Sequence, residues 1–527
     1  MKNVLGREIP ESIQGYGTVK PFKGAFESLG NVEKKSVQLR SIVPGESKIL
    51  SSIREAMEKC NIKDGMTISF HHHLRNGDYV LNMVLEEVAN MGLKDIKVAA
   101  SSIFPIHAPL VEHMRNGTVT GIYANYMSGP VAEAISRGEL KNPAIMHTHG
   151  GRARAIQAGD LKIDIAFIAS PTCDSYGNIN GVQGPAACGS LGYAIPDALY
   201  ADKTVAITDN LVPYPASPIE ITQEYIDYIV EVDSIGDPKG IVSGTTRITR
   251  DPVGLKIAKM TSQVIEASGL LKDGFSFQTG AGGTSLAVAA YVKELMKEKE
   301  IVGSFAAGGI TGYIVDMFEE GLFKSLFDVQ CFDLKAVESY RDNKNHQGMS
   351  ASMYGNPHNK GAVVNNLDVM ILGATEIDTD FNVNVTTGSN GMIMGGSGGH
   401  SDTAAGAKLS IVVTQLMRGR LPIIVDSVTT VTTPGESIDV LVTERGIAVN
   451  PQRQDLIEKL KDTNLPVMTI EELKEMAEEM TGIPEKIQLD DKIVAVVEYR
   501  DGTVIDVVRK IKDWFYAWYY TGKNRFK

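Results

Sequence analysis

One pattern of apolar and polar residues occurs twice in this chain and constrains its fold more than any other feature. The first copy spans residues 163–180 (IDIAFIASPTCDSYGNIN) and the second spans residues 367–384 (LDVMILGATEIDTDFNVN). In this register the matched pairs are Asp164 with Asp368, Asp174 with Asp378, Asn178 with Asn382, and Asn180 with Asn384. Each copy has an apolar run typical of a buried strand, followed by a polar turn. The duplication predicts two similar domains that face each other across a ligand cleft.

A second pair of segments extends the repeat. Residues 64–70 (DGMTISF) and 273–280 (DGFSFQTG) each place an Asp-Gly turn before a β-rich run, and helix-like runs follow at 80–91 and 286–296. Chance similarity between α/β segments is the alternative explanation. Strands and helices alternate through most of the chain, which predicts an α/β fold with mostly parallel sheets covered by helices.

Composition limits the possible classes of protein. A chain of 527 residues is too long for one core, and its net charge of −12 disfavours nucleic acid as a partner. No apolar stretch reaches the roughly 20 residues of a membrane span, and residues 1–7 (MKNVLGR) lack a secretory signal, so we expect a cytoplasmic protein without membrane contact. The cysteines are scattered and expected to be reduced: Cys60, Cys173, Cys188 and Cys331.

Four regions are expected along the chain. Residues 1–45 are polar and irregular and form an N-terminal extension. The first domain spans 46–236 and the second spans 237–512, because residues 233–240 (DSIGDPKG) are rich in helix and strand breakers. Residues 513–527 form a tail with the aromatic run WFYAWYY at 514–520, expected as a docking helix or a loose tail.

A glycine-rich loop at residues 278–286 (QTGAGGTSL) lies between an expected strand and an expected helix. Its residues Thr279, Gly280, Ala281, Gly282 and Gly283 allow a ligand to approach the backbone, and the helix N-terminus favours negative charge. The loop can hold a phosphate, a carboxylate or the oxyanion of a thioester adduct. It matches neither a dinucleotide fingerprint nor a P-loop, and a tight structural turn is the alternative.

A second glycine-rich loop at residues 395–402 (GGSGGHSD) follows the second repeat. Its small residues Gly396, Gly398 and Gly399, followed by His400, would leave room for a long, thin ligand such as a pantetheine arm. Between the repeat's strand and this loop lies an acidic turn. Asp378 in that turn matches Asp174 and is expected to be architectural, whereas Glu376 replaces Thr172 of the first copy and is the better functional candidate.

Several motifs together resemble the α subunit of citrate lyase. They are residues 69–78 (SFHHHLRNGD), 147–151 (HTHGG), 188–194 (CGSLGYA), 278–283, 376–385 (EIDTDFNVNV) and 395–402. The resemblance implies two tandem CoA-transferase-like α/β domains. It also implies a transferase that exchanges acetate for citrate on the thiol of an acyl carrier protein. The implied partners are a lyase (β) subunit and an acyl carrier (γ) subunit in an oligomeric complex. The carrier's arm is a CoA-like phosphopantetheine group, and no permanently bound cofactor is expected.

The wider superfamily offers a test of mechanism, because many relatives use a glutamate that forms a covalent thioester with CoA. Alignment of residues 314–321 (IVDMFEEG) with the corresponding helix of those relatives puts Gly308 at the position of the nucleophile. Residues 305–311 (FAAGGIT) contain no carboxylate, and glycine cannot act as a nucleophile. We therefore expect direct transfer through a mixed anhydride, with Glu376 as the reserve candidate for a nucleophile.

Direct transfer requires oxyanion donors and groups that neutralise three carboxylates. The expected catalytic residues are Gly280, Gly282, Gly283 and Glu376. The expected carboxylate-binding residues of the first domain are His71, His72, Arg75, His147, His149, Gly150, Gly151 and Arg152. Contacts to the carrier arm are expected from Thr279, Gly280, Ala281, Gly396, Gly398, Gly399 and His400. The histidines lack a cysteine or carboxylate that would complete a metal-ligand pattern, so we expect no metal site.

Three other interpretations fit the sequence. One is a citramalate lyase α-type transferase, which would act on a smaller dicarboxylate. Another is a catalytically silent ligand-binding scaffold with the same fold. The last is a covalent CoA-transferase or a thioester hydrolase, which a trapped glutamyl thioester would reveal.

Overall fold

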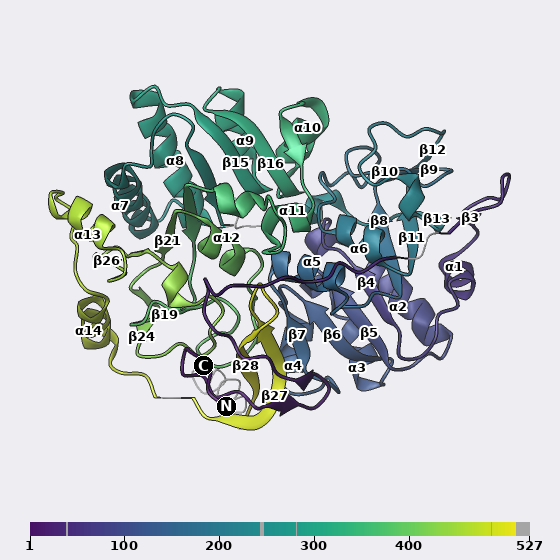
Figure 1. Cartoon of the computed structure of the whole chain (residues 1–527), viewed down its shortest axis with the longest axis horizontal. Coiled ribbons are helices and arrows are strands. Elements are labelled where there is room, and N and C mark those ends of the chain that lie inside the picture. Colours follow the sequence, from purple (N-terminus) through teal and green to yellow (C-terminus); the bar gives the residue numbers. More distant parts are fainter. Residues whose placement is uncertain (38–39, 243–246, 281, 486, 513–527) are drawn as a thin grey trace, which may run out of the picture.

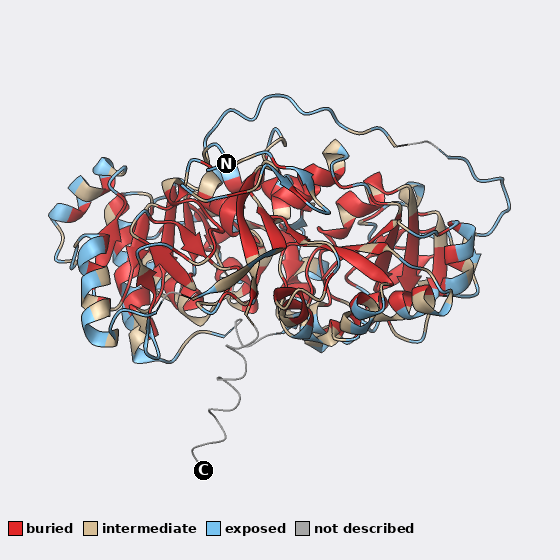
Figure 2. Cartoon of the chain, turned by 90° about the horizontal axis from the view of Figure 1, so that it is seen from below, coloured by how far each residue is buried: buried red, intermediate tan, exposed pale blue. Residues whose placement is uncertain are grey.

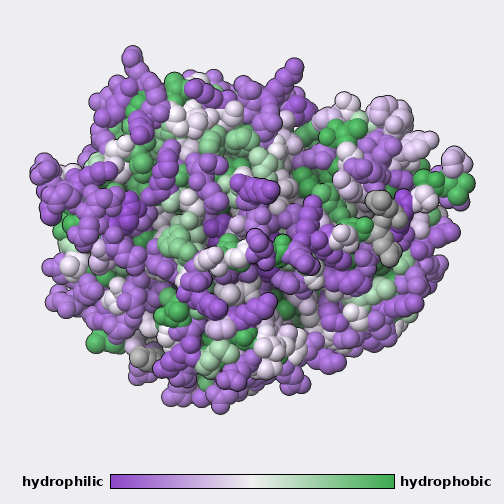
Figure 3. Space-filling model, viewed as in Figure 1, coloured by the Kyte–Doolittle hydropathy of each residue, from purple (hydrophilic) through white to green (hydrophobic). Residues whose placement is uncertain are grey.

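A computed structural model of the chain describes residues 1–37, 40–242, 247–280, 282–485 and 487–512. Two mostly parallel sheets, each covered by helices, lie side by side (Figure 1). The strands and the inner helix faces are buried, and exposed residues lie on outer helix faces and in loops (Figure 2). Hydrophilic side chains cover most of the face in Figure 3. No helix in the described part of the chain has the length and apolarity to cross a bilayer.

The two sheets repeat one strand order. The first runs β28 (Val504–Ile511), β27 (Leu489–Glu498), β7 (Ala144–Met146), β6 (Val119–Ala124), β5 (Ile96–Ala100), β4 (Thr67–Phe70), β8 (Ile165–Ser170), β11 (Lys203–Thr208), β13 (Tyr228–Glu231) and β3 (Ile49–Leu50). The second runs β17 (His346–Gly348), β16 (Phe323–Cys331), β15 (Gly303–Ile310), β14 (Ser276–Thr279), β18 (Val369–Leu372), β21 (Leu409–Val413), β25 (Val440–Val442) and β26 (Ile447–Val449). The neighbouring strands from β7 to β13 in the first sheet follow the same connection order as those from β17 to β25 in the second. This shared topology confirms the expected fold class.

The paired aspartates make the same contacts in both halves. Asp164 accepts a hydrogen bond from the backbone N–H of Thr67 at 2.8 Å, and Asp368 accepts one from Ser276 at 2.9 Å. Each hydrogen bond connects the start of one central strand to the residue just before the neighbouring strand. The internal duplication predicted from the sequence is therefore present in the fold.

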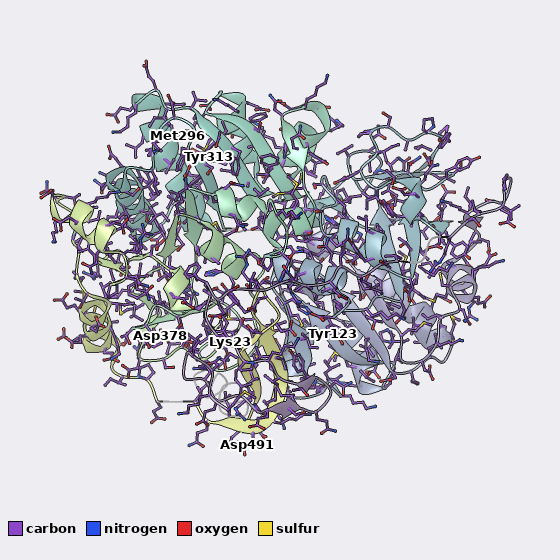
Figure 4. All side chains as sticks on the ribbon, viewed as in Figure 1. Lys23, Tyr123, Met296, Tyr313, Asp378 and Asp491 are labelled. Atoms are coloured by element: carbon purple, nitrogen blue, oxygen red, sulfur yellow. The ribbon has the colours of Figure 1, made fainter. Side chains whose placement is uncertain are left out.

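A small sheet follows each copy of the repeat. In the first half it consists of β10 (Ile179–Asn180), β9 (Thr172–Asp174) and β12 (Leu211–Val212). In the second it consists of β20 (Val383–Asn384), β19 (Glu376–Asp378) and β24 (Ile424–Val425). Asp174 accepts a hydrogen bond from the backbone N–H of Asn178 at 3.1 Å. Asp378 (labelled in Figure 4) accepts one from the backbone N–H of Asn382 at 2.9 Å. Asp378 closes a turn, as its match with Asp174 predicted.

Helices cover both sheets. Those of the first half are α1 (Ile53–Lys59), α2 (Val80–Asn90), α3 (Leu110–Arg115), α4 (Pro130–Ser136), α5 (His149–Ala158) and α6 (Ala194–Tyr200). Those of the second are α7 (Pro252–Ser268), α8 (Gly283–Glu298), α9 (Gly312–Glu319), α10 (Leu334–Asp342), α11 (Ala351–Gly355), α12 (His400–Gly406), α13 (Gln454–Lys461) and α14 (Ile470–Thr481). The longest, α7, begins with an Asp251 cap and ends at Gly269 in the left-handed conformation, as capping rules predict.

The C-terminal hairpin changes the expected division of the chain. Strand β27 pairs in parallel with β7, with Ala495 opposite Ala144, and β28 pairs with β27. Residues 489–511 therefore extend the first sheet, although we expected 237–512 to form one domain. The strand pattern was visible in the sequence, but its partner was not, because period-2 alternation does not specify which edge a strand joins.

The N-terminal extension is more ordered than its polar composition suggested. Ile9, Ile13 and Val19 are buried against the β27–β28 hairpin, and the backbone of Phe22 hydrogen-bonds to Val504. Arg7 forms an ion pair with Asp506 on β28 at 2.7 Å. The expected tail at 513–527 lies outside the described residues.

Candidate functional site

A glycine allows the halves to meet closely where α5 packs against α11, and a second glycine lies beside it. A Cβ atom on Gly150 would lie 2.0 Å from the carbonyl oxygen of Gly355, and one on Gly151 would lie 2.8 Å from Thr148 Oγ1. The N–H of Gly151 donates to that hydroxyl at 2.8 Å and so caps α5. Close packing and helix capping are the roles these contacts indicate. Substrate contact by Gly150 and Gly151 stays a prediction.

Asp402 of α12 fixes the first turn of α5 from the opposite half. Its carboxylate accepts hydrogen bonds from Thr148 Oγ1 and from the N–H of Gly150, each at 2.8 Å. Arg500, in the turn of the β27–β28 hairpin, lies 3.6 Å from the same carboxylate. Because α5 begins with His149, these contacts hold that imidazole at the seam between the halves.

The second glycine loop runs along this seam. Gly398 accepts a hydrogen bond from the N–H of His149 at 2.8 Å. A Cβ atom on Gly396 would lie 2.3 Å from a backbone carbonyl of the first half, and one on Gly399 would lie 2.3 Å from the Tyr354 hydroxyl. The absence of a side chain at Gly396 lets the two halves approach each other, and Gly399 leaves room for the Tyr354 hydroxyl within the second half. A role for them in holding a carrier arm stays a prediction.

An aromatic cluster of His72, His149, Tyr193 and Tyr354 lies at the seam. Ring centroids are 4.5 Å apart for His72 and Tyr193, 4.5 Å for His149 and Tyr193, and 5.7 Å for the two imidazoles. His149 lies 6.5 Å from Tyr354 of the second half. The cluster therefore joins the carboxyl ends of β4 and β7 to α11. Ligands of parallel sheets bind at the carboxyl ends of the strands.

The two imidazoles of the cluster are neutral at pH 7. Burial lowers the pKa of His149 to about 3, and it lowers that of His72 well below its ordinary value. The Asn125 side-chain amide donates to Nδ1 of His149 at 2.8 Å, so the proton of this ring is on Nε2. Nδ1 of His72 lies 2.6 Å from Ser101 Oγ. Nε2 of both rings has no hydrogen-bond partner among the described residues.

Arg75 is a cation without an acidic partner in the described structure. Its guanidinium lies 5.5 Å from the Phe104 ring centroid and 4.7 Å from that of Phe332, while Nη1 is buried without a hydrogen bond. Burial lowers its pKa, although guanidinium remains charged. The backbone φ of +51° places Arg75 in the left-handed region, where a side chain other than glycine is strained. A carboxylate would supply the missing partner.

His71 and His400 are committed to structural contacts. Nε2 of His71 accepts from the backbone N–H of Ala169 at 3.0 Å, and its Nδ1 contacts Nδ1 of His73. The ring nitrogens of His400 lie 2.7 Å from Thr433 Oγ1 and 2.9 Å from a backbone carbonyl oxygen. Substrate or carrier contact by either histidine stays a prediction.

His147 points toward the C-terminal hairpin. Its Nε2 lies 3.4 Å from Glu498 of β27, and its ring stacks on Tyr123 (labelled in Figure 4) at 6.1 Å. Glu498 also accepts a hydrogen bond from the Tyr16 hydroxyl at 2.8 Å. These contacts connect His147 to the N-terminal segment and the hairpin.

Arg152 has a buried partner. Its guanidinium donates to both carboxylate oxygens of Asp197, at 2.7 and 2.8 Å, and to the carbonyl of Ala99 at 2.9 Å. Arg152 and Asp197 are 3% and 1% exposed, so the pair lies inside the protein. The positive charge is already neutralised, and we leave Arg152 out of the proposed substrate contacts.

Glu376 is hydrogen-bonded in the small sheet of the second half. Its carboxylate accepts from Asn384 at 2.9 Å and from the N–H and hydroxyl of Thr429 at 2.8 and 3.1 Å. Thr172, its counterpart in the first half, accepts from Asn210 at 2.8 Å. A buried carboxylate held by three donors is stabilised in place, which fits a structural role better than nucleophilic attack.

The first glycine loop joins β14 to the N-terminus of α8. The N–H of Gly280 donates to a carbonyl of β18 at 2.8 Å, so it is not a free oxyanion donor. Gly282 precedes the helix without a side-chain cap, and Gly283 begins it. No described side chain caps the first turn of α8, so its N–H groups can serve as oxyanion donors. Ala281 lies outside the described residues.

Gly308 cannot be replaced by a catalytic glutamate without rearrangement. Its φ is +103°, and a Cβ atom there would lie 2.4 Å from Nε2 of Gln278 on β14.

Four further residues lie at the site and are not among those predicted from the sequence: Gln278, Tyr193, Tyr354 and Asn125. Gln278 and Tyr193 fall inside the motifs already singled out, so their position beside the glycine and histidine motifs was the available signal.

Comparison with known proteins agrees with this architecture. A solved 4-hydroxybutyrate CoA-transferase from Porphyromonas gingivalis shares the fold, with a TM-score of 0.53, 16% identity, and 82% of this chain and 96% of that chain covered. A solved putative α subunit of citrate lyase from Streptococcus mutans, in complex with citrate, has a TM-score of 0.94 and 52% identity. The match covers 97% of this chain and 100% of that chain. The Haemophilus influenzae citrate lyase α chain is 52% identical over 89% of this chain and 94% of its own length.

The repeated sheets and the seam between them define a protein of the CoA-transferase fold. Residues 46–511 match the family described as citrate lyase, alpha subunit. The chain belongs to the citrate lyase α-subunit family.

Proposed function

We propose that this chain is the transferase subunit of a citrate lyase complex and exchanges acetate for citrate on the thiol of an acyl carrier protein. Family membership supports the assignment, as does the citrate in the similar Streptococcus mutans structure. The observation that carries it is Arg75, a partly buried cation without an acidic partner among the described residues, beside the neutral imidazoles of the aromatic cluster. A polycarboxylate fits this combination, because it neutralises the cation and accepts hydrogen bonds from the rings.

One carboxylate of citrate pairs with the guanidinium of Arg75 in this proposal. The Nε2–H of His149 donates to a second carboxylate, and His72 lies 5.7 Å away across the cluster to contact the same acid. Neutral imidazoles bind a carboxylate by hydrogen bonds without adding fixed charge to the site. Arg75 and the imidazole donors at the seam would therefore orient the acid toward the first glycine loop.

The transfer itself needs no nucleophile from the protein. An oxygen of a citrate carboxylate attacks the acetyl carbonyl carbon, and the C–S bond breaks to release the carrier thiolate. The thiolate then attacks the citryl carbonyl of the mixed anhydride, and the bond from that carbon to the bridging oxygen breaks to release acetate. The oxyanion formed in each step would lie at the first turn of α8, where Gly283 and the next residues supply N–H donors.

The remaining parts of the complex are proposals as well. A lyase (β) subunit would split the citryl thioester, and an acyl carrier (γ) subunit would bring its CoA-like phosphopantetheine arm to the seam. The chain itself would hold no permanent cofactor. Close packing of the halves at Gly150 and Gly396 would exclude water and so protect the anhydride from hydrolysis.

The assignment is tested by mixing the purified chain with acetyl-CoA and citrate and by measuring citryl-CoA with mass spectrometry. We expect citryl-CoA and free acetate in equal amounts. Reaction with citramalate but not with citrate would show that the substrate is wrong. If neither acid reacts, with acetyl-CoA or with an acetylated carrier protein, the transferase proposal fails and a binding scaffold remains.

Citrate binding should leave His149 neutral above pH 7 and take up no proton on this ring. Burial lowers the pKa of the free His149 to about 3, and its Nδ1 already accepts a hydrogen bond from Asn125, which a second ring proton would break. Since the free protein and the complex then hold equal numbers of protons, the affinity for citrate should agree within about twofold at pH 7.5 and pH 8.5. Calorimetric titration in phosphate and in Tris buffer measures the proton count. Uptake of a whole proton, with affinity that falls as the pH rises from 7.5 to 8.5, would contradict this expectation.

A further inference from the structure

Gln278 has one unsatisfied hydrogen-bonding atom at the seam. The residue is 5% exposed on β14, and its Nε2 donates to the Tyr354 hydroxyl at 2.8 Å. Its Oε1 is buried and has no hydrogen-bond partner among the described residues. A buried acceptor without a donor is costly, so a site that contains one is suited to a ligand that brings a donor.

The surroundings of Gln278 place this acceptor next to the aromatic cluster. The hydroxyl of Tyr354 holds the amide, and the ring of Tyr354 lies 6.5 Å from that of His149. On another side, the absence of a side chain at Gly308 leaves room for the amide, because a Cβ there would lie 2.4 Å from Nε2. The amide therefore lies between Gly308 of β15 and Tyr354 of the cluster, near the end of β14 that leads into the first glycine loop. In the proposed function the acid and the thioester meet here.

The chemistry of the proposed substrate identifies the donor. Ionised carboxylates only accept hydrogen bonds, and they would repel an amide oxygen. The tertiary hydroxyl of citrate is the donor that this acid can offer. An acid of the same shape without the hydroxyl would leave Oε1 of Gln278 unpaired in the complex.

We propose that Gln278 is a specificity-determining residue whose Oε1 accepts a hydrogen bond from the hydroxyl group of the acid. The site would thereby select hydroxy acids over polycarboxylates that lack the hydroxyl. Tyr354 is the positioning residue that orients the amide. This inference rests on the proposed function, since it concerns the acid that binds at the same seam.

The test compares citrate with tricarballylate, which is citrate without its hydroxyl, by calorimetric titration of the full chain. The wild-type protein should bind citrate about 10- to 100-fold more tightly. Gln278→Met keeps the volume and removes the amide, so the two affinities should agree within about threefold. Tyr354→Phe should give an intermediate ratio of the two affinities, because the amide of Gln278 remains but loses its hydrogen bond to the Tyr354 hydroxyl. Gln347→Met, at an exposed glutamine on β17, is the matched control and should keep the wild-type ratio.

The outcomes separate this inference from the proposed function. Equal wild-type affinities for the two acids would overturn the role of Gln278 and leave the proposed function intact, because the amide would then present its N–H to a carboxylate. An unchanged preference in a folded Gln278→Met variant would also overturn it, with thermal unfolding as the check of folding. If wild-type protein binds neither acid, the proposed function fails, and this inference fails with it.

Discussion

Replacement of Arg75 by leucine is expected to weaken citrate binding by roughly 30- to 4,000-fold, which corresponds to the 2–5 kcal/mol lost when one partner of a buried charged pair is removed. The guanidinium has no acidic partner in the described structure, and its Nη1 is buried without a hydrogen bond. The guanidinium packs over two aromatic rings, those of Phe104 and Phe332, and lies 4.7 Å from the Phe332 ring centroid. Because Arg75 neutralises no other residue in the described part of the chain, its removal should affect ligand binding far more than folding.

Calorimetric Kd values and initial rates of citryl-CoA formation measure this effect. Arg75→Lys keeps the charge but not the planar fork, so it should recover only part of the affinity. Arg250→Leu, at an exposed position in the same protein, is the control and should bind citrate as the wild type does. A Kd for Arg75→Leu within threefold of the wild-type value would remove Arg75 from the site.

Replacement of Arg152 by methionine should lower the free energy of unfolding by about 3–5 kcal/mol, because it leaves Asp197 as a buried, unpaired carboxylate. Both partners are almost fully buried, and two hydrogen bonds of 2.7 and 2.8 Å join them. Urea unfolding monitored by circular dichroism measures the change. The effect is on stability, since the charge of Arg152 is already satisfied inside the first half.

A second variant distinguishes this account from a direct role of Arg152 in substrate binding. Arg152→Met combined with Asp197→Leu removes both charges and should recover most of the lost stability. The double variant should also bind citrate with nearly the wild-type Kd. Loss of citrate binding in a stably folded double variant would show that Arg152 contacts the substrate.

The duplication was predictable because the two copies share the same local order of apolar and polar residues. The aspartates at 164 and 368 occupy the same register of an apolar run, and both hold the adjacent strand in the same way. Two buried parallel strands need apolar residues on both faces, which leaves a continuous signal in the sequence. The fold class and the position of both glycine loops followed from such signals.

The site could be predicted only in part, since the role of a polar residue depends on partners that are distant in sequence. Arg75 and Arg152 look alike in the sequence, yet only Arg152 meets a carboxylate. His72 and His149 reach the seam, whereas His147 meets Glu498 of a hairpin that sequence reasoning had placed in the other domain. Glu376 is a functional candidate in the sequence because its counterpart is a threonine. Its carboxylate accepts hydrogen bonds from Asn384 and Thr429, and a catalytic role for it stays a prediction.

The central claim is that acetate leaves with an oxygen taken directly from citrate. A single turnover with citrate labelled with oxygen-18 in its carboxylates, followed by mass spectrometry of acetate and protein, tests it most directly. Direct attack predicts one heavy oxygen in acetate and none in the protein. A covalent route through an enzyme carboxylate would put the heavy oxygen into the protein and release unlabelled acetate, and that result would contradict the account.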